Sequence, residues 1–181
     1  MASSTQSPHD LPPHYAVALG SNRAGAHGRP ADEVRAALAA LGAIGRVVAS
    51  PIVASAPLGP SIRRFANAVA LVETDASPPD LLARLKAIER RFGRRRGRRW
   101  GARVLDLDIV LWSGGRWRSA GLAVPHVAYR ERRFVLDPLA DLAPRRRDPG
   151  PGSTAGLTIR QLARRLTARR PAPRPRGRVG L

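Results

Sequence analysis

Two aspartates, Asp106 and Asp108, interrupt an otherwise apolar run at residues 104–111 of this 181-residue chain. The alternation predicts a β-strand with one apolar face, made of Leu105, Leu107, Ile109 and Leu111. Both carboxylates then share the opposite face, about 7 Å apart. Two such charges raise each other's pKa unless a cation lies between them, and oxygen ligands suit Mg²⁺ or Mn²⁺. The pair therefore indicates either a metal site for phosphoryl transfer or simply the solvent-facing side of an antiparallel strand.

An arginine-rich segment leads directly into this strand. Seven of the ten residues from Arg90 to Arg99 are arginine, Trp100 follows them, and Arg103 opens the strand. One interpretation is a flexible basic lid that closes over a polyphosphate, with Trp100 covering a ring. The other is a solvated charge run that binds nucleic acid non-specifically. The position beside two acids favours the lid, because a magnesium-nucleotide site needs acids for the metal and arginines for the phosphates.

The composition narrows the classes of partner. The net charge is +19, and all but one of the 32 basic residues are arginine, so we expect a polyanionic partner. The absence of cysteine excludes disulfides, thiolate metal sites and a cysteine nucleophile. No apolar stretch resembles a signal peptide or a membrane span, so we expect a cytoplasmic protein without membrane contact.

The hydrophobic pattern predicts the order β-α-β-β-α-β followed by a helical tail. This is the α+β ferredoxin-like plan, an antiparallel sheet with helices packed on it. We expect a strand over 46–55 interrupted by Pro51, and a helix that begins after Ser77 as its N-cap. A short helix is expected over 130–136. Residues 1–13 are expected to be a flexible leader, 14–168 the folded domain, and 169–181 an arginine- and proline-rich tail.

Two further polar residues fall inside or beside these elements. Asn67 lies within the strand that begins at Phe65, and a buried asparagine must satisfy its amide. A heterocycle with adjacent donor and acceptor atoms would do so, and a neighbouring backbone group would do so equally well. His126 follows Pro125, with Arg132 and Phe134 a short distance further along the chain.

Several short motifs occur together in a fixed order along the chain. They are Ala18–Asn22, Ala56–Pro60, Phe65–Val69, Ile88-Glu89, Arg99–Ile109, Val124–His126 and Arg132–Leu139. Over roughly residues 15–144 the chain thereby resembles the 6-hydroxymethyl-7,8-dihydropterin pyrophosphokinase family of folate biosynthesis. The string Arg-Trp-Gly-x-Arg-x-Leu-Asp-Leu-Asp-Ile is its most specific motif.

The resemblance implies transfer of the terminal diphosphate of ATP to the pterin hydroxymethyl group, with release of AMP. By resemblance, Asp106 and Asp108 hold two magnesium ions and form the catalytic set with Arg94 and Arg103. The expected partners are ATP and the pterin, with no specific nucleic acid, and the chain is expected to act as a monomer.

The resemblance also implies roles for the binding residues. Asn67 reads the pterin edge and Phe65 and Phe134 sandwich its ring. The loop with Pro57 and Leu58 lines the same pocket. The positions that match nucleotide contacts are Glu89, Arg103, His126 and Arg132. The positions that match the mobile loop that closes on the substrates are Arg94, Arg96 and Trp100.

A protein of another class stays open at this point: a basic nucleic-acid-binding module on a ferredoxin-like sheet. Such sheets display aromatic residues on adjacent strands for base stacking. Aromatic residues make up only 4% of this chain, and its first and third strands carry no such pair. Pterin-dependent formation of AMP from ATP distinguishes the two classes.

Overall fold

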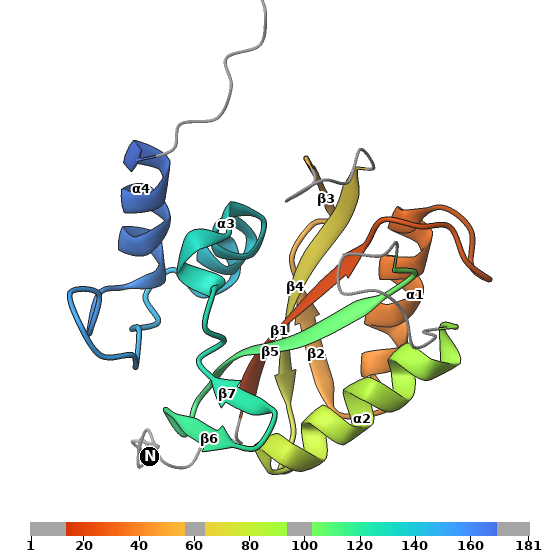
Figure 1. Ribbon diagram of the computed structural model, residues 1–181, viewed down its shortest axis with the longest axis horizontal. Helices are drawn as coiled ribbons and strands as arrows, with labels where there is room; N and C mark the ends of the chain where they lie inside the picture. The colour runs from red at the N-terminus through yellow and green to blue at the C-terminus, as the bar shows by residue number, and fades with distance from the viewer. Residues whose placement is uncertain (1–13, 57–63, 94–102, 170–181) are drawn as a thin grey trace, which may run out of the picture.

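The computed structural model describes residues 14–56, 64–93 and 103–169. Its centre is an antiparallel sheet in the order β2–β4–β1–β5, in which β3 also pairs with β4. The strands are β1 (His14–Ser21), β2 (Arg46–Ala49), β3 (Val53–Ser55), β4 (Phe65–Glu73) and β5 (Asp106–Trp112). Together with helices between β1 and β2 and between β4 and β5, this is the predicted α+β ferredoxin-like fold (Figure 1).

The edge next to β4 is divided as the sequence predicts. Both β2 and β3 pair with β4, and Pro51 lies between them. Proline has no N–H for a sheet hydrogen bond, so the edge strand stops and restarts around it.

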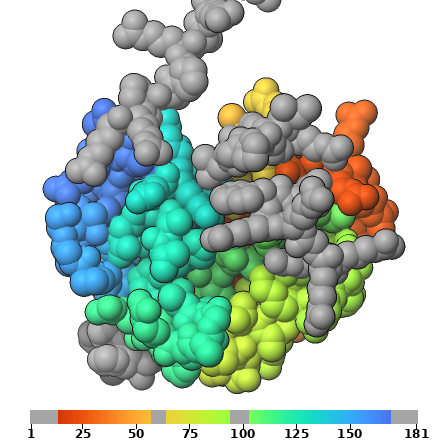
Figure 2. Space-filling model, in the orientation of Figure 1, coloured from red at the N-terminus to blue at the C-terminus, as the bar shows by residue number. Residues whose placement is uncertain are grey.

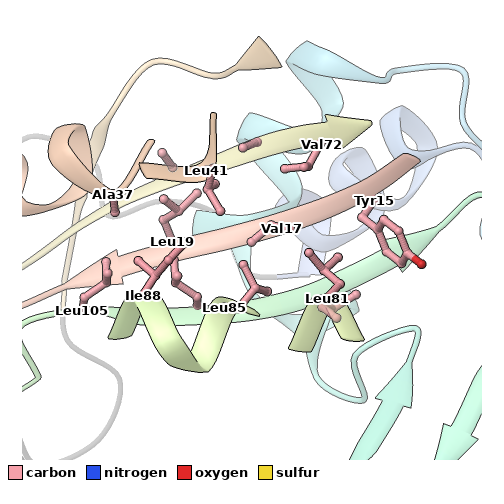
Figure 3. Packing of buried hydrophobic residues seen from close by; sticks show 14 of the residues in the cluster. Tyr15, Val17, Leu19, Ala37, Leu41, Val72, Leu81, Leu85, Ile88 and Leu105 are labelled. Carbon is pink, nitrogen blue, oxygen red and sulfur yellow. The ribbon is translucent and has the colours of Figure 1, made fainter. Parts of the chain in front are cut away.

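One face of the sheet is covered by α1 (Pro30–Leu41) and α2 (Pro78–Arg91). Ser77 caps α2, because its hydroxyl accepts a hydrogen bond from the N–H of Asp80. Figure 3 shows Leu81, Leu85 and Ile88 of α2 packed toward Val17 and Leu19 of β1. These side chains are buried and form the larger apolar core.

The second face of the sheet is covered at one end by η1 (Tyr129–Glu131), α3 (Arg133–Leu142) and α4 (Ile159–Arg169). Val69 and Val110 of the sheet pack there in a second buried cluster with Leu136 and Ile159. A small hairpin of β6 (Trp117–Ser119) and β7 (Leu122–Val124) connects β5 to this region. Figure 1 shows α3 and α4 on one side of the sheet and α1 and α2 on the other. In Figure 2 the blue and cyan atoms of α4 and α3 lie at the left, and the yellow-green atoms of α2 lie at the lower right.

The structure has a bulge in β5 that interrupts the predicted alternation of apolar and polar residues. Val17 lies opposite Ile109, whereas Ala16 lies opposite Leu111, so Val110 is an extra residue on β5. Leu111 consequently packs in the second cluster and not on the face of Leu105 and Leu107. The prediction was wrong for Leu111, because a bulge breaks the period of two. The aspartates precede the bulge, so their shared face is unaffected.

The predicted helix over 130–136 is also corrected. The structure has the short η1 followed by α3, which continues through Pro138 to Leu142. Leu136 and Leu139 of α3 are fully buried, so tertiary packing continues this helix past the predicted end at residue 136 and through Pro138.

Asp148 joins the loop before α4 to η1. Its carboxylate accepts hydrogen bonds from Tyr129 Oη at 2.7 Å, from Arg130 Nε and Nη2 at 2.6 Å each, and from the N–H of Gly150 at 2.8 Å. Burial by itself would raise the pKa of Asp148, but these donors outweigh it and lower the pKa to about 2.

This pKa predicts a pH-dependent effect of Asp148→Asn. The depressed pKa stabilises the fold above the ordinary pKa of aspartate, near 4, and that contribution is lost as the pH falls toward about 2. At pH 7 we expect Asp148→Asn to lower the free energy of unfolding by about 2 kcal/mol, and by clearly less at pH 2.5. Urea unfolding of both proteins at the two pH values measures the difference. A gap that does not change with pH would contradict this account.

Candidate active site

The predicted polar residues lie on the second face of the sheet, beyond the end that α3 covers. They fall in two neighbouring rows, where a row is a set of residues that lie opposite one another on β4, β1 and β5. In one row Asn67 of β4 lies opposite Gly20 of β1, and Gly20 lies opposite Asp106 of β5. Adjacent strands lie 4.7–4.9 Å apart, so the backbones of Asn67 and Asp106 are roughly 10 Å apart. In the next row Ala18 lies opposite Asp108. The small residues of β1 therefore separate the asparagine from the two acids.

The two carboxylates share one face of β5 and both reach solvent, with 31% of the Asp106 side chain and 37% of the Asp108 side chain exposed. Arg103 Nη1 donates to Asp106 Oδ2 at 2.8 Å. His126 Nε2 lies 3.9 Å from Asp108 Oδ2. Each acid thus has a cationic or polar side chain beside it, and together they form a site of mixed charge.

His126 faces Asp108 as a neutral ring. Its Nδ1 accepts a hydrogen bond from the N–H of Ala128 at 3.1 Å, so its proton lies on Nε2, toward Asp108. Burial lowers the pKa of His126 below its usual range and Arg132 lowers it further, against the opposite effects of Asp108 and Asp106. At pH 7 the ring can therefore donate one hydrogen bond without adding a charge.

The donor set fits magnesium. Asp106 and Asp108 provide only oxygen ligands and lie on an exposed face. In the part of the chain that the structure describes, no group of three or more His, Cys, Asp or Glu side chains could hold a metal ion. Two carboxylates leave coordination positions for phosphate oxygens and water, which is how Mg²⁺ is usually held in phosphoryl-transfer sites.

Asn67 is almost fully buried, with 3% of its surface exposed. Its Nδ2 donates to Ser55 Oγ of β3 at 2.8 Å. The sequence suggested a heterocycle or a backbone group as partner. The structure shows a side-chain hydroxyl on the neighbouring strand as one partner, and a heterocycle as a further partner stays a prediction. Ser55 is a contact that sequence reasoning missed, and no local signal marks it because the pairing of β3 with β4 creates it.

Gly20 leaves the space in which the Asn67 carboxamide lies. A Cβ added at Gly20 would lie 3.2 Å from Asn67 Oδ1, which is tighter than ordinary van der Waals contact. We expect Gly20→Val to displace this carboxamide and to raise about tenfold the KM for the pterin that the resemblance implies, the loss of roughly one good hydrogen bond. Gly20→Ala should have a smaller effect. Steady-state kinetics on both variants, with thermal unfolding to verify the fold, test this; an unchanged KM in Gly20→Val would contradict the role of Gly20.

The aromatic residues predicted to hold a ring approach the same face from two elements. Phe65 begins β4 two residues before Asn67, and Phe134 lies in α3. Arg132 Cζ lies 5.9 Å from the centroid of the Phe134 ring, a cation–π distance. The structure thus places Arg132 beside an aromatic ring at the start of α3.

Glu89 lies elsewhere than the other predicted nucleotide contacts. It is fully buried on α2, and its Oε1 accepts hydrogen bonds from the N–H of Leu107 at 2.7 Å and from Lys86 Nζ at 2.8 Å. A contact between Glu89 and a nucleotide stays a prediction. Lys86 was not singled out from the sequence, although its spacing of three residues from Glu89 on a helix is the signal for such a pair.

Asn22 makes another contact that the sequence did not clearly indicate. Its Oδ1 accepts from the N–H of Arg103 at 2.8 Å, and its own N–H donates to the carbonyl of Arg103 at 3.2 Å. This two-point link fixes the backbone of Arg103 against the end of β1. The predicted residues Pro57, Leu58, Arg94, Arg96 and Trp100 lie outside the described residues.

Fold and site together indicate a class: a ferredoxin-like protein whose exposed carboxylate pair fits divalent cations, set among basic residues suited to phosphate. A family comparison identifies the family within this class. The model of 7,8-dihydro-6-hydroxymethylpterin-pyrophosphokinase (HPPK) matches residues 16–144. The chain belongs to this family of pyrophosphokinases, which are transferases of folate biosynthesis.

Individual relatives agree with this assignment. The chain is 47% identical over 137 residues to a 2-amino-4-hydroxy-6-hydroxymethyldihydropteridine pyrophosphokinase of Pseudomonas aeruginosa, an alignment that covers 74% of this chain and 82% of that protein. A protein of the same name from Haemophilus influenzae is 40% identical, over 70% of this chain and 79% of that protein. The fold matches that of Plasmodium falciparum HPPK-DHPS with a TM-score of 0.66 at 14% identity, over 90% of this chain and 45% of that longer chain.

Proposed function

We propose that this protein transfers diphosphate from ATP to 6-hydroxymethyl-7,8-dihydropterin and releases AMP. The observation that carries the proposal is that Asp106, Asp108 and Asn67 lie in adjacent rows of one face of the sheet. The proposed site for metal and phosphate then lies within roughly 10 Å of a buried carboxamide, about the span from a bicyclic pterin to its reacting hydroxymethyl group.

We propose that Asp106 and Asp108 hold two magnesium ions. When bound, these ions would neutralise phosphate charge and favour the deprotonated form of the attacking hydroxyl. Arg103 pairs with Asp106 and lies where it can turn to phosphate oxygens. His126 presents Nε2–H as a neutral donor, and Arg132 adds a positive charge. The protein's main contribution is then alignment of the reactants and charge stabilisation. Arg94, Arg96 and Glu89 are proposed as further groups for the triphosphate nucleotide.

For the pterin, we propose that the Asn67 carboxamide pairs with the donor and acceptor edge of the ring. Phe65 and Phe134 are proposed to stack on its two faces, which would hold a flat, polar heterocycle. Pro57, Leu58 and Trp100 are proposed to complete this pocket. The buried state of Asn67 supports the assignment, because a desolvated carboxamide discriminates strongly between ligands that satisfy it and ligands that do not.

Among the residues that the structure describes, no helix is long and apolar enough to cross a membrane. We propose that residues 14–168 form the catalytic domain, between a leader at 1–13, which lies outside the described residues, and a basic tail at 169–181. We also propose that the protein acts as a cytoplasmic monomer. Its net charge of +19 is proposed to serve ATP binding and to select no particular nucleic acid sequence.

The direct test of the reaction is AMP release from ATP in magnesium, with and without 6-hydroxymethyl-7,8-dihydropterin. We expect AMP and pterin diphosphate in equal amounts, and only when the pterin is present. If no pterin-dependent AMP forms at any practical enzyme concentration, the proposal is wrong and the nucleic-acid-binding alternative gains weight.

A further inference from the structure

The strand that carries both aspartates lies at an edge of the sheet. In the order β2–β4–β1–β5, one side of β5 pairs with β1 and the other side has no strand beside it among the described residues. The peptide groups on an open edge need partners when they are buried, and a loosely held edge strand can shift. The position of Asp106 and Asp108 therefore depends on what holds this outer edge.

Two side chains of α2 bind the edge at Leu107, the residue between the aspartates. Glu89 Oε1 accepts from the N–H of Leu107 at 2.7 Å, and Lys86 Nζ donates to the carbonyl of Leu107 at 3.2 Å. Lys86 Nζ also bonds to Glu89 Oε1 at 2.8 Å, and the two residues lie three apart on the helix. The pair thus supplies one acceptor and one donor, the two bonds that a neighbouring strand would offer.

The environment makes these bonds strong and costly to lose. Glu89 and Leu107 are fully buried, and the Lys86 side chain is one-third exposed. A buried carboxylate without partners is unfavourable, and a charge-assisted hydrogen bond is stronger than a neutral one. Lys86 is the only lysine in the chain, although it stands among 31 arginines.

We propose that Lys86 and Glu89 are positioning residues that clamp the Leu107 peptide and so fix the relative positions of the Asp106 and Asp108 carboxylates. The pair acts from the edge of β5 and need not touch substrate. This inference rests on the proposed function of the two aspartates as magnesium ligands. It goes beyond that function by assigning to Oε1 of Glu89 a role separate from any nucleotide contact.

Three variants distinguish the clamp from a direct contact. Glu89→Ala removes the acceptor, whereas Glu89→Gln keeps a carboxamide oxygen for the N–H of Leu107. Lys86→Met keeps the aliphatic stem and removes the donor, and it guards against failure of Glu89→Ala to fold. The readouts are amide hydrogen exchange of Leu107 by NMR, Mn²⁺ binding by electron paramagnetic resonance with a nonhydrolysable ATP analogue, and the KM for the pterin.

We expect Leu107 exchange in Glu89→Ala to accelerate at least about tenfold, the amount expected for loss of one charge-assisted hydrogen bond, while exchange at Leu19 in the sheet centre is unchanged. Mn²⁺ affinity should fall about tenfold in Glu89→Ala, less in Lys86→Met, and within about threefold of wild type in Glu89→Gln. The KM for the pterin should stay within about twofold in all three variants, because Asn67 lies on β4 and β1 separates it from the clamped strand β5.

Unchanged Leu107 exchange in Glu89→Ala and Lys86→Met would overturn the clamp. Faster exchange with unchanged Mn²⁺ affinity would overturn its positioning role. Equal loss of nucleotide affinity in Glu89→Gln and Glu89→Ala, with Leu107 still protected, would show a direct nucleotide contact instead. The exchange measurement needs no turnover, so its result is independent of whether wild-type protein forms AMP from the pterin and ATP.

Discussion

Asp108→Asn is expected to reduce kcat about a thousandfold while the dissociation constant of the pterin stays within about twofold. The substitution keeps the size of the side chain and removes the charge that would hold a cation. A thousandfold loss corresponds to roughly 4 kcal/mol of transition-state stabilisation, which is within the range of metal-assisted charge stabilisation. Pterin binding should persist, because Asn67 lies in a different row of the sheet, on the far side of β1.

The measurement pairs kcat from pterin-dependent AMP formation with pterin binding by calorimetry. Asp137→Asn is a matched control, since Asp137 is a partly exposed acid on α3 that pairs with Arg133 of the same helix. We expect wild-type kcat from this control. If Asp108→Asn retained near-normal turnover, Asp108 would have no essential role in holding the metal.

The second large effect is expected for Asn67→Ala. Removal of the carboxamide should raise the KM for the pterin about a hundredfold, because a buried site built to hydrogen-bond a heterocycle loses both its donor and its acceptor. Affinity for the ATP analogue should be unchanged, since Asn67 and Asp106 are separated by Gly20 on β1.

Ser55→Ala is the matched control for Asn67. Ser55 Oγ accepts the Asn67 Nδ2 hydrogen bond, so its removal perturbs the carboxamide without deleting it. We expect a rise in pterin KM of about tenfold or less in Ser55→Ala. A larger effect of Ser55→Ala than of Asn67→Ala would show that the serine, and not the asparagine, contacts the ligand. The two variants together separate the contact from its support.

Much of the fold could be predicted from periodicity and turn chemistry. The order of strands and helices, the break at Pro51 and the cap at Ser77 all follow from local signals, and the structure confirms them. The bulge at Val110 could not be predicted, because it depends on the register in which β1 and β5 pair, and no local pattern in β5 determines that register. The length of α3 could not be predicted either, since burial of Leu139 outweighs the local effect of Pro138.

The candidate site likewise has residues that the sequence could predict and contacts that it could not. Asp106 and Asp108 could be found from the sequence because two charges in an apolar strand are locally unusual. Their neighbours could not, since the contacts of Asn67 with Ser55 and of Asn22 with Arg103 join residues on different elements. Glu89 was assigned by resemblance alone, and its bond to Leu107 depends on how α2 lies along the edge of β5. Distant pairings of this kind need three-dimensional information.

The most direct measurement is a crystal structure of the protein grown with magnesium, a nonhydrolysable ATP analogue and the pterin. The account predicts that carboxylate oxygens of Asp106 and Asp108 coordinate divalent cations that also contact the phosphates. Density that shows the nucleotide and its metal bound elsewhere, with both carboxylates facing bulk solvent, would contradict it.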